Sequence, residues 1–158
     1  MEIRGGDPPV TVPELCQRVL SRDRVIAVVG WSAQPERASH EVSAYMHAHG
    51  YRIVGVNPAY AGCSDAMLAG PCYDSLALAA QALAEQGRCV EMVNVFRRIE
   101  AVPAVVSEAL AIGPRSLWLQ LGVVHDAAAC EARQAGLDVV MDRCLKIDHA
   151  ALSRAGLL

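Results

Sequence analysis

The sequence is poor in aromatic residues, which make up 4% of its 158 residues, yet 53% of the chain is hydrophobic. The core therefore has to be built from aliphatic side chains, and this apolar fraction excludes a disordered chain. The length suits one domain whose core needs neither disulfides nor metal.

Features that would indicate nucleic-acid or lipid partners are missing. The formal net charge is −3, and no run of Lys or Arg marks a surface for nucleic acid or an anionic membrane. No stretch approaches the roughly 18 apolar residues of a membrane span. The beginning, MEIRGGDPPV, lacks the basic and apolar regions of a signal peptide. We therefore expect a cytoplasmic protein with no nucleic-acid or membrane partner.

No two cysteines are spaced as CxxC, and their spacing matches no zinc site. The six cysteines are Cys16, Cys63, Cys72, Cys89, Cys130 and Cys144. In a reducing compartment we expect free thiols and no metal site. Cys16, Cys89 and Cys130 are expected to act as small hydrophobic residues in the core.

Short apolar runs alternate with helical patterns along most of the chain. The predicted strands are Val25–Val29, Arg52–Val56, Cys89–Phe96, Ser116–Leu121 and Asp138–Met141. The predicted helices are Thr11–Ser21, Ser39–His49, Tyr73–Gln86, Ile99–Ile112, Asp126–Ala135 and Lys146–Leu152. Short links predict an α/β fold, a Rossmann-like, doubly wound, mostly parallel five-stranded sheet with helices on both faces.

The expected organisation is one domain with short additions. Met1–Val10 is rich in Gly and Pro and is expected to be loose. Residues 1–21 would form an N-terminal segment with a short helix, residues 22–148 the domain, and residues 149–158 a C-terminal tail.

The loop that follows the first predicted strand, residues 30–39, has the residues of an anion site. Ligands of open parallel sheets bind beyond the carboxyl ends of the strands. Gly30 gives the backbone room to turn and lets a phosphate approach, Ser32 offers a hydroxyl, and Arg37 offers a guanidinium. Ser39 is expected to cap the next helix, whose N-terminus favours a diphosphate. The alternative is an ordinary strand–helix turn with a capping serine.

The second predicted strand ends in Val56-Asn57-Pro58, without a carboxylate. NAD-binding domains normally carry Asp or Glu there, which hydrogen-bonds the ribose. A carboxylate would repel a phosphorylated ribose, whereas Asn57 tolerates it, and coenzyme A carries a ribose 3′-phosphate. The bland alternative, that Asn57-Pro58 starts a turn, does not exclude this contact.

Six blocks lie mainly at the ends of predicted strands. They are Val28-Val29-Gly30-x-Ser32, Arg37-x-Ser39, Val56-Asn57-Pro58, Val95-Phe96-Arg97-Arg98, Trp118-Leu119-Gln120-Leu121-Gly122 and Met141-Asp142-Arg143-Cys144. In this order they resemble the small stand-alone CoA-binding-domain proteins of the YccU type. These are relatives of the CoA-binding domain of the succinyl-CoA synthetase alpha subunit, and the resemblance covers residues 22–148.

The resemblance implies a binding site for coenzyme A or an acyl-CoA. The loop after the first strand would hold the diphosphate, and the end of the second strand would hold the adenosine. The end of the third strand would flank the adenine or the pantetheine. The implied residues are Gly30, Trp31, Ser32, Arg37, Ser39, Val56, Asn57, Pro58, Val95, Phe96 and Arg97. The sequence departs from the pattern in three respects: Asn94 stands where the family usually has Asp, the segment Ala77–Arg88 looks a few residues long, and Tyr60 stands where the synthetase subunit has Lys.

Three functions remain open from the sequence. The first is a non-catalytic carrier or sensor for coenzyme A. The second is an NAD(P)-dependent oxidoreductase, and the third is an interaction domain with a vestigial nucleotide fold. We expect no catalytic residues, because the chain has no GxSxG, HExxH or Walker motif. Homodimer formation is left open.

A few further residues have both a structural and a functional interpretation. Arg97-Arg98 is either a phosphate clamp or a solvated pair, and Asp142-Arg143 is expected to form an ion pair that fixes its loop. Cys144 lies near two cations, so a mixed disulfide with the thiol of coenzyme A is an alternative to an inert thiol. His40 and His125 are candidates for ligand contact.

Overall fold

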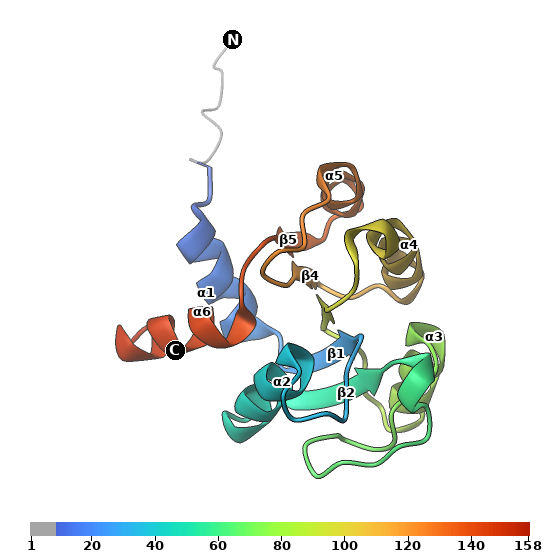
Figure 1. Ribbon diagram of the computed structural model, residues 1–158. Helices are drawn as coiled ribbons and strands as arrows, with labels where there is room; N and C mark the ends of the chain where they lie inside the picture. Colours follow the sequence, from blue (N-terminus) through green and yellow to red (C-terminus); the bar gives the residue numbers. More distant parts are fainter. Residues whose placement is uncertain (1–8) are drawn as a thin grey trace.

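All five predicted strands form one parallel sheet in the computed structural model, which describes residues 9–158 (Figure 1). The strands are β1 (Val25–Val29), β2 (Arg52–Val56), β3 (Met92–Val95), β4 (Ser116–Leu119) and β5 (Asp138–Val140). Their order is β2-β1-β3-β4-β5, and every neighbouring pair is parallel. The predicted fold class is confirmed. In this order the connections reverse direction between β1 and β3, which opens a crevice there.

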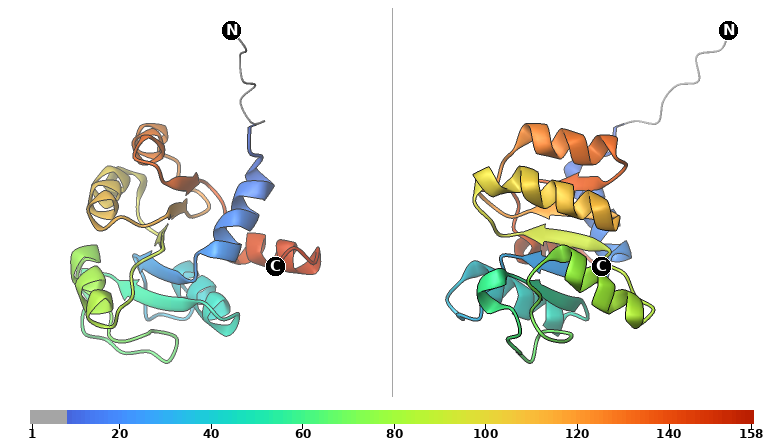
Figure 2. Two further views of the ribbon diagram at one scale, coloured as in Figure 1. Left: turned by 180° about the vertical axis from the view of Figure 1, so that it is seen from behind. Right: turned by 90° about the vertical axis from the view of Figure 1, so that its right-hand side faces the viewer.

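Two layers of helices cover the sheet (Figure 2). The α-helices are α1 (Val12–Arg22), α2 (Ala38–Ala48), α3 (Leu76–Glu85), α4 (Val102–Ile112), α5 (Asp126–Gln134) and α6 (Leu145–Arg154). The 3-10 helices η1 (Pro58–Tyr60) and η2 (Ile99–Ala101) are short. Helices α3, α4 and α5 lie on one face, and α1, α2 and α6 lie on the other. None of the helices within residues 9–158 has the length and apolarity needed to cross a membrane.

The central strand β1 divides the core between these layers because its side chains alternate. Val25, Ala27 and Val29 pack with α3, α4 and α5 in a cluster of aliphatic side chains. Ile26 and Val28 pack in the opposite cluster. All five residues of β1 are buried, as expected for a strand covered on both faces.

The predicted element ends differ from the observed ends for identifiable reasons. Helix α3 begins at Leu76 because Tyr73 pairs with Val56 as an extended bridge and Ser75 caps the helix. Helix α6 extends past the predicted Lys146–Leu152, so the tail expected from residue 149 begins inside a helix. The loose segment expected at residues 1–10 lies, up to residue 8, outside the described residues.

The expected burial of three cysteines is correct for one of them. Cys16 is buried, and burial raises the pKa of its thiol to about 11, so it stays protonated at neutral pH. Cys89 and Cys130 are exposed, which makes their predicted core role wrong. Cys89 precedes the start of β3, and Cys130 is one of the exposed residues of α5, so neither side chain is enclosed by the two helical layers.

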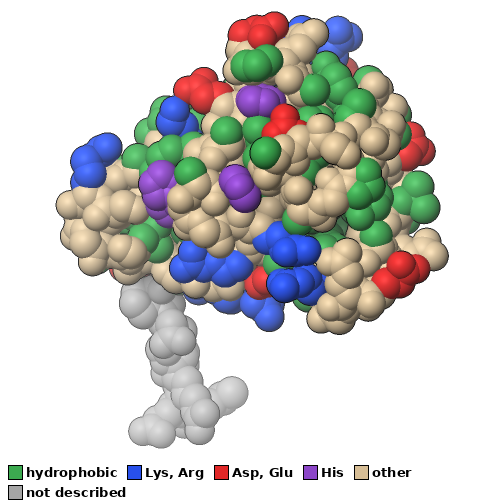
Figure 3. All heavy atoms as spheres, turned by 90° about the horizontal axis from the view of Figure 1, so that it is seen from below, with side chains coloured by type: hydrophobic (Ala, Val, Ile, Leu, Met, Phe, Trp, Pro, Cys, Tyr) green, Lys and Arg blue, Asp and Glu red, His purple; other side chains and the backbone are tan. Residues whose placement is uncertain are grey.

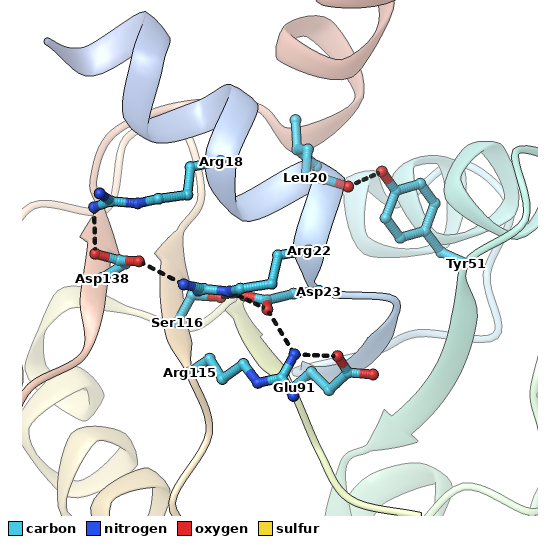
Figure 4. A network of polar contacts seen from close by, with 9 residues as sticks. All are labelled: Arg18, Leu20, Arg22, Asp23, Tyr51, Glu91, Arg115, Ser116 and Asp138. Carbon is cyan, nitrogen blue, oxygen red and sulfur yellow. Dashed lines mark hydrogen bonds and ion pairs between the residues drawn. The ribbon is translucent and has the colours of Figure 1, made fainter. Parts of the chain in front are cut away.

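A buried carboxylate joins α1 to the amino ends of the strands (Figure 4). Asp23 is fully buried and accepts hydrogen bonds from Arg22 Nε and Nη2 at 2.7 and 2.9 Å. The hydroxyl of Ser116, at the start of β4, donates to the same carboxylate at 2.6 Å. Arg22 also donates to Asp138, the first residue of β5, at 3.0 Å. This network therefore stabilises the end of the sheet opposite the strand tips.

A histidine cluster holds α6 against α2. His149 is 5% exposed, and its Nδ1 lies 3.0 Å from the hydroxyl of Tyr45. His49 stacks on Tyr45, and the edge of the His149 ring meets Tyr51. Burial lowers the pKa of His149, and the nearby charges of His49 and Arg24 lower it further. The neutral imidazole is therefore the form that fits the folded protein.

Replacing Asp23 by Ala is expected to lower the free energy of unfolding by about 3 kcal/mol, because the change removes the partner of several buried hydrogen bonds. Urea denaturation measures the loss. Arg18→Ala is the control, since Arg18 forms an exposed ion pair with Asp138, and it should cost less than about 1 kcal/mol. Equal losses in the two variants would contradict the central role of Asp23.

The melting temperature should fall as the pH falls below about 6.5, because the unfolded chain then takes up a proton that folded His149 resists. His149→Phe keeps a neutral ring and should show a smaller fall between pH 7.5 and pH 5.5 in thermal melts. His47→Gln, a change at an exposed position, should keep the wild-type fall. An unchanged pH dependence in His149→Phe would rule out this contribution.

Candidate functional site

A cavity of about 610 Å³ lies at the carboxyl ends of the four strands β1 to β4. The first residue after each strand is part of this region: Gly30 after β1, Asn57 after β2, Phe96 after β3 and Gln120 after β4. The lining residues are Gly30, Ser32, Gln34, Arg37, Ala38, Ser39, Asn57, Tyr60, Phe96, Arg97, Arg98, Gln120, Leu121 and Val123. The cavity thus occupies the crevice where the strand order reverses.

Most of the residues expected to bind a ligand come together in the lining of this cavity. The lining includes Gly30, Ser32, Arg37, Ser39, Asn57, Phe96 and Arg97. The other four stand outside it. Trp31, Val56 and Val95 are buried in the core, and Pro58 is exposed on η1. Their expected contact with a ligand stays a prediction.

Gly30 is required by the neighbouring backbone. Its φ is +90°, and a Cβ at this position would lie 2.2 Å from the carbonyl oxygen of Phe96. The amide of Gly30 donates to the carbonyl of Val56 at 2.8 Å, and the amide of Phe96 donates to the carbonyl of Val29 at the same distance. The loops after β1 and β3 therefore approach closely at Gly30, a constraint that the sequence did not reveal. The sequence had indicated a different reason for glycine at this position, which was room for a phosphate.

The N-terminus of α2 lies at the cavity wall. Arg37, and not Ser39 as predicted, is the N-cap residue, and no side chain accepts hydrogen bonds from the first amides. Ala38 and Ser39 both line the cavity. Ser32 is held in place, since its hydroxyl donates to Tyr60 Oη at 3.2 Å and accepts from the amide of Gln34 at 3.1 Å. Uncapped helix amides carry partial positive charge, so this wall suits an anion.

The cavity is basic although the whole chain is acidic. Arg37, Arg97 and Arg98 line it, and its described lining contains no Asp or Glu. None of the three forms an ion pair within residues 9–158. Arg97 and Arg98 also border a second hollow that includes Glu100. On the face seen in Figure 3, several Lys and Arg side chains gather in the lower middle, whereas the Asp and Glu side chains lie apart from one another.

Asn57 closes the second strand in two ways. Its Oδ1 accepts from the amide of Ala59 at 3.0 Å, which caps η1, and its Nδ2 donates to the carbonyl of Trp31 at 2.8 Å. The turn that the sequence offered as an alternative is therefore present. Asn57 still lines the cavity, and no acidic residue occurs from Arg52 to Tyr60.

Several lining residues were absent from the predicted set. They are Gln34, Ala38, Tyr60, Arg98, Gln120, Leu121 and Val123. Tyr60 and Arg98 were noted for other reasons, and Gln120 and Leu121 belong to the block that supported the resemblance. Gln120, a residue that is 7% exposed, was assigned to the interior of the predicted strand Ser116–Leu121, whereas β4 ends at Leu119.

The remaining candidates have structural roles. Asp142 and Arg143 do not pair with each other. Asp142 accepts from the amide of Gly122 at 2.7 Å, and Arg143 pairs with Asp148 at 2.6 Å. The predicted ion pair is wrong because Asp142 has a left-handed backbone (φ 58°) and caps the neighbouring loop.

The two histidines and Cys144 lie outside the main cavity lining. His125 caps α5, because its ring accepts a hydrogen bond from the amide of Ala128. The Nε2 atom of His40 lies 3.5 Å from Oδ2 of Asp65. Cys144 lines a smaller hollow of about 210 Å³, which shares Leu121 with the main cavity. The hollow lined by Cys144 therefore meets the main cavity at Leu121.

The comparisons with known proteins agree with this geometry. The sequence pattern of the family described as CoA binding domain matches residues 24–150. The uncharacterized protein YneT of Bacillus subtilis is 37% identical over 134 residues, which cover 85% of this chain and 91% of the relative.

Solved structures share the fold over nearly the whole chain. The PH1109 protein redesigned for binding has a TM-score of 0.77 at 30% identity and covers 94% of this chain and 96% of its own. The protein cell-free ID.343 from Thermus thermophilus has a TM-score of 0.76 at 30% identity, covering 90% of this chain and 99% of its own. The family match spans all five strands, together with the crevice between β1 and β3. This chain belongs to the CoA-binding-domain family.

Proposed function

We propose that this protein binds coenzyme A or an acyl-CoA in the cavity above β1 to β4 and acts as a non-catalytic carrier or sensor. One observation carries the proposal: three arginines without ion pairs and the uncapped N-terminus of α2 line one cavity whose described lining has no carboxylate. Such a wall favours a ligand with several negative charges. Coenzyme A has a diphosphate and a ribose phosphate, and the family match supports this choice.

The diphosphate fits best at the first loop. Arg37 and the amides of Ala38 and Ser39 lie at the N-terminus of α2, and Ser32 stands beside them. The adenosine would lie toward the end of β2, near Asn57 and Tyr60. Because no carboxylate stands there, a phosphorylated ribose meets no repulsion, whereas the usual hydrogen bond to the ribose of NAD is missing. The cavity volume of about 610 Å³ is in the range of small-molecule sites.

The proposal includes a cytoplasmic location and membership of the stand-alone CoA-binding proteins of the YccU type. All six cysteines are free thiols, which agrees with a reducing compartment. Trp31, Val56, Pro58 and Val95 are proposed as further contacts of the ligand.

Coenzyme A should raise the melting temperature, whereas NAD should not. A ligand at 100 times its dissociation constant adds about 2.7 kcal/mol, a shift of several degrees for a domain of this size. A thermal-shift titration with coenzyme A, acetyl-CoA, NAD and NADP makes the comparison. A shift with NAD or NADP alone would favour an oxidoreductase, and no shift with any of them would favour an interaction domain with a vestigial site.

Arg37→Ala and Ser32→Ala should each weaken coenzyme A binding by about 1–3 kcal/mol, the range for hydrogen bonds to a charged group. Isothermal titration calorimetry gives the affinities. Arg133→Ala is the matched control, because it removes the same charge from an exposed position on α5. If both variants bind as tightly as the control, the diphosphate lies elsewhere.

A further inference from the structure

The side-chain oxygen of Gln120 is buried and has no hydrogen-bond partner among the described residues. The side chain is 7% exposed, lines the main cavity, and its Oε1 is buried with no hydrogen bond in the described chain. Its backbone is fully used, since its amide donates to the carbonyl of Val95 and its carbonyl accepts from the amide of Val123. The residue is therefore firmly placed, while its side chain is unsatisfied.

An unsatisfied buried carboxamide is costly to the fold, and nearly all buried polar groups in proteins have partners. A partner supplied by a ligand would remove that cost. A carboxamide has an acceptor and a donor on one flat group, and rotation about its last side-chain bond can present either of them. Gln120 is thus suited to a ligand group with both an N–H and a C=O.

If the proposed function is correct, the position of Gln120 indicates which part of coenzyme A it contacts. Along the strand tips the order is β2, β1, β3 and β4, so Asn57 and Gln120 stand at opposite ends of the cavity. Three strand spacings separate β2 from β4, about 14 Å. With adenosine over β2 and diphosphate over β1, the next part of coenzyme A, its pantetheine arm, lies over β3 and β4.

The chemistry of this end of the cavity also fits the pantetheine arm. The arm is a hydrocarbon chain interrupted by two secondary amides, each with an N–H and a C=O. Phe96, Leu121 and Val123 give apolar surface beside Gln120, and Leu121 is 61% exposed. Apolar surface next to one unpaired carboxamide matches such a chain better than it matches a phosphate.

We propose that Gln120 hydrogen-bonds an amide of the pantetheine arm, so that it distinguishes coenzyme A from nucleotides that lack this arm. This inference rests on the proposed function, because it takes the place of the adenosine and the diphosphate from it. The side chain of Gln120 acts on ligand choice, whereas its backbone serves the fold.

The test compares coenzyme A with 3′-phosphoadenosine 5′-diphosphate, which lacks the pantetheine arm, by calorimetry on wild-type protein and Gln120→Met. Methionine keeps the size and length of the side chain but removes both hydrogen-bonding atoms. Affinity for coenzyme A should fall about tenfold, and affinity for the truncated nucleotide should stay the same. The melting temperature without ligand should be unchanged or higher, since an unsatisfied polar atom is removed.

Ser32→Ala is the matched control, and it should weaken both ligands by the same factor. An equal loss for both ligands in Gln120→Met would overturn the inference by placing Gln120 at the nucleotide, and unchanged binding of both would show that Gln120 makes no contact. A lower melting temperature with unchanged discrimination would indicate a purely structural role and also overturn it. If wild-type protein binds neither ligand, the proposed function itself is wrong.

Discussion

The site depends on how closely the ends of β1 and β3 approach each other. These neighbouring strands send their chains to opposite faces of the sheet, and the crevice opens where they part. Gly30 and Phe96 come so near that no side chain fits between their backbones. This contact sets the floor of the cavity and the path of the loop that leads to α2, so the arginine and serine positions follow from it.

The two ends of the sheet have different electrostatic characters. At the amino ends of the strands, Asp23 is buried and satisfied by Arg22 and Ser116. At the carboxyl ends, cationic side chains and helix amides converge with no described carboxylate in the cavity wall. The first arrangement neutralises its charges within the chain and stabilises the fold. The second leaves positive charge for a molecule from solution, which is how a chain with an overall charge of −3 can attract an anionic ligand.

The sequence predicted the fold well because buried parallel strands are nearly pure aliphatic runs, and β1 and β2 were located to the residue. It also indicated the first loop, because ligand sites of such sheets lie at the strand ends. It could not show which residue is the N-cap of α2, since Ser39 resembles a capping serine and only the backbone identifies Arg37. Gln120 was missed as a site residue because the predicted fourth strand ran on to Leu121, whereas β4 ends at Leu119 and leaves Gln120 at its carboxyl end.

The fully buried Trp31 packs against Tyr60 in the lining of the main cavity. The rings of Trp31 and Tyr60 form a T-shaped pair with their centroids 5.8 Å apart. Tyr60 lines the cavity, and its hydroxyl accepts a hydrogen bond from the hydroxyl of Ser32. Any molecule that displaces Tyr60 changes the surroundings of an indole that is shielded from water. If a ligand moves Tyr60, the emission of Trp31 should change, so this indole would report occupancy of the cavity without an added label.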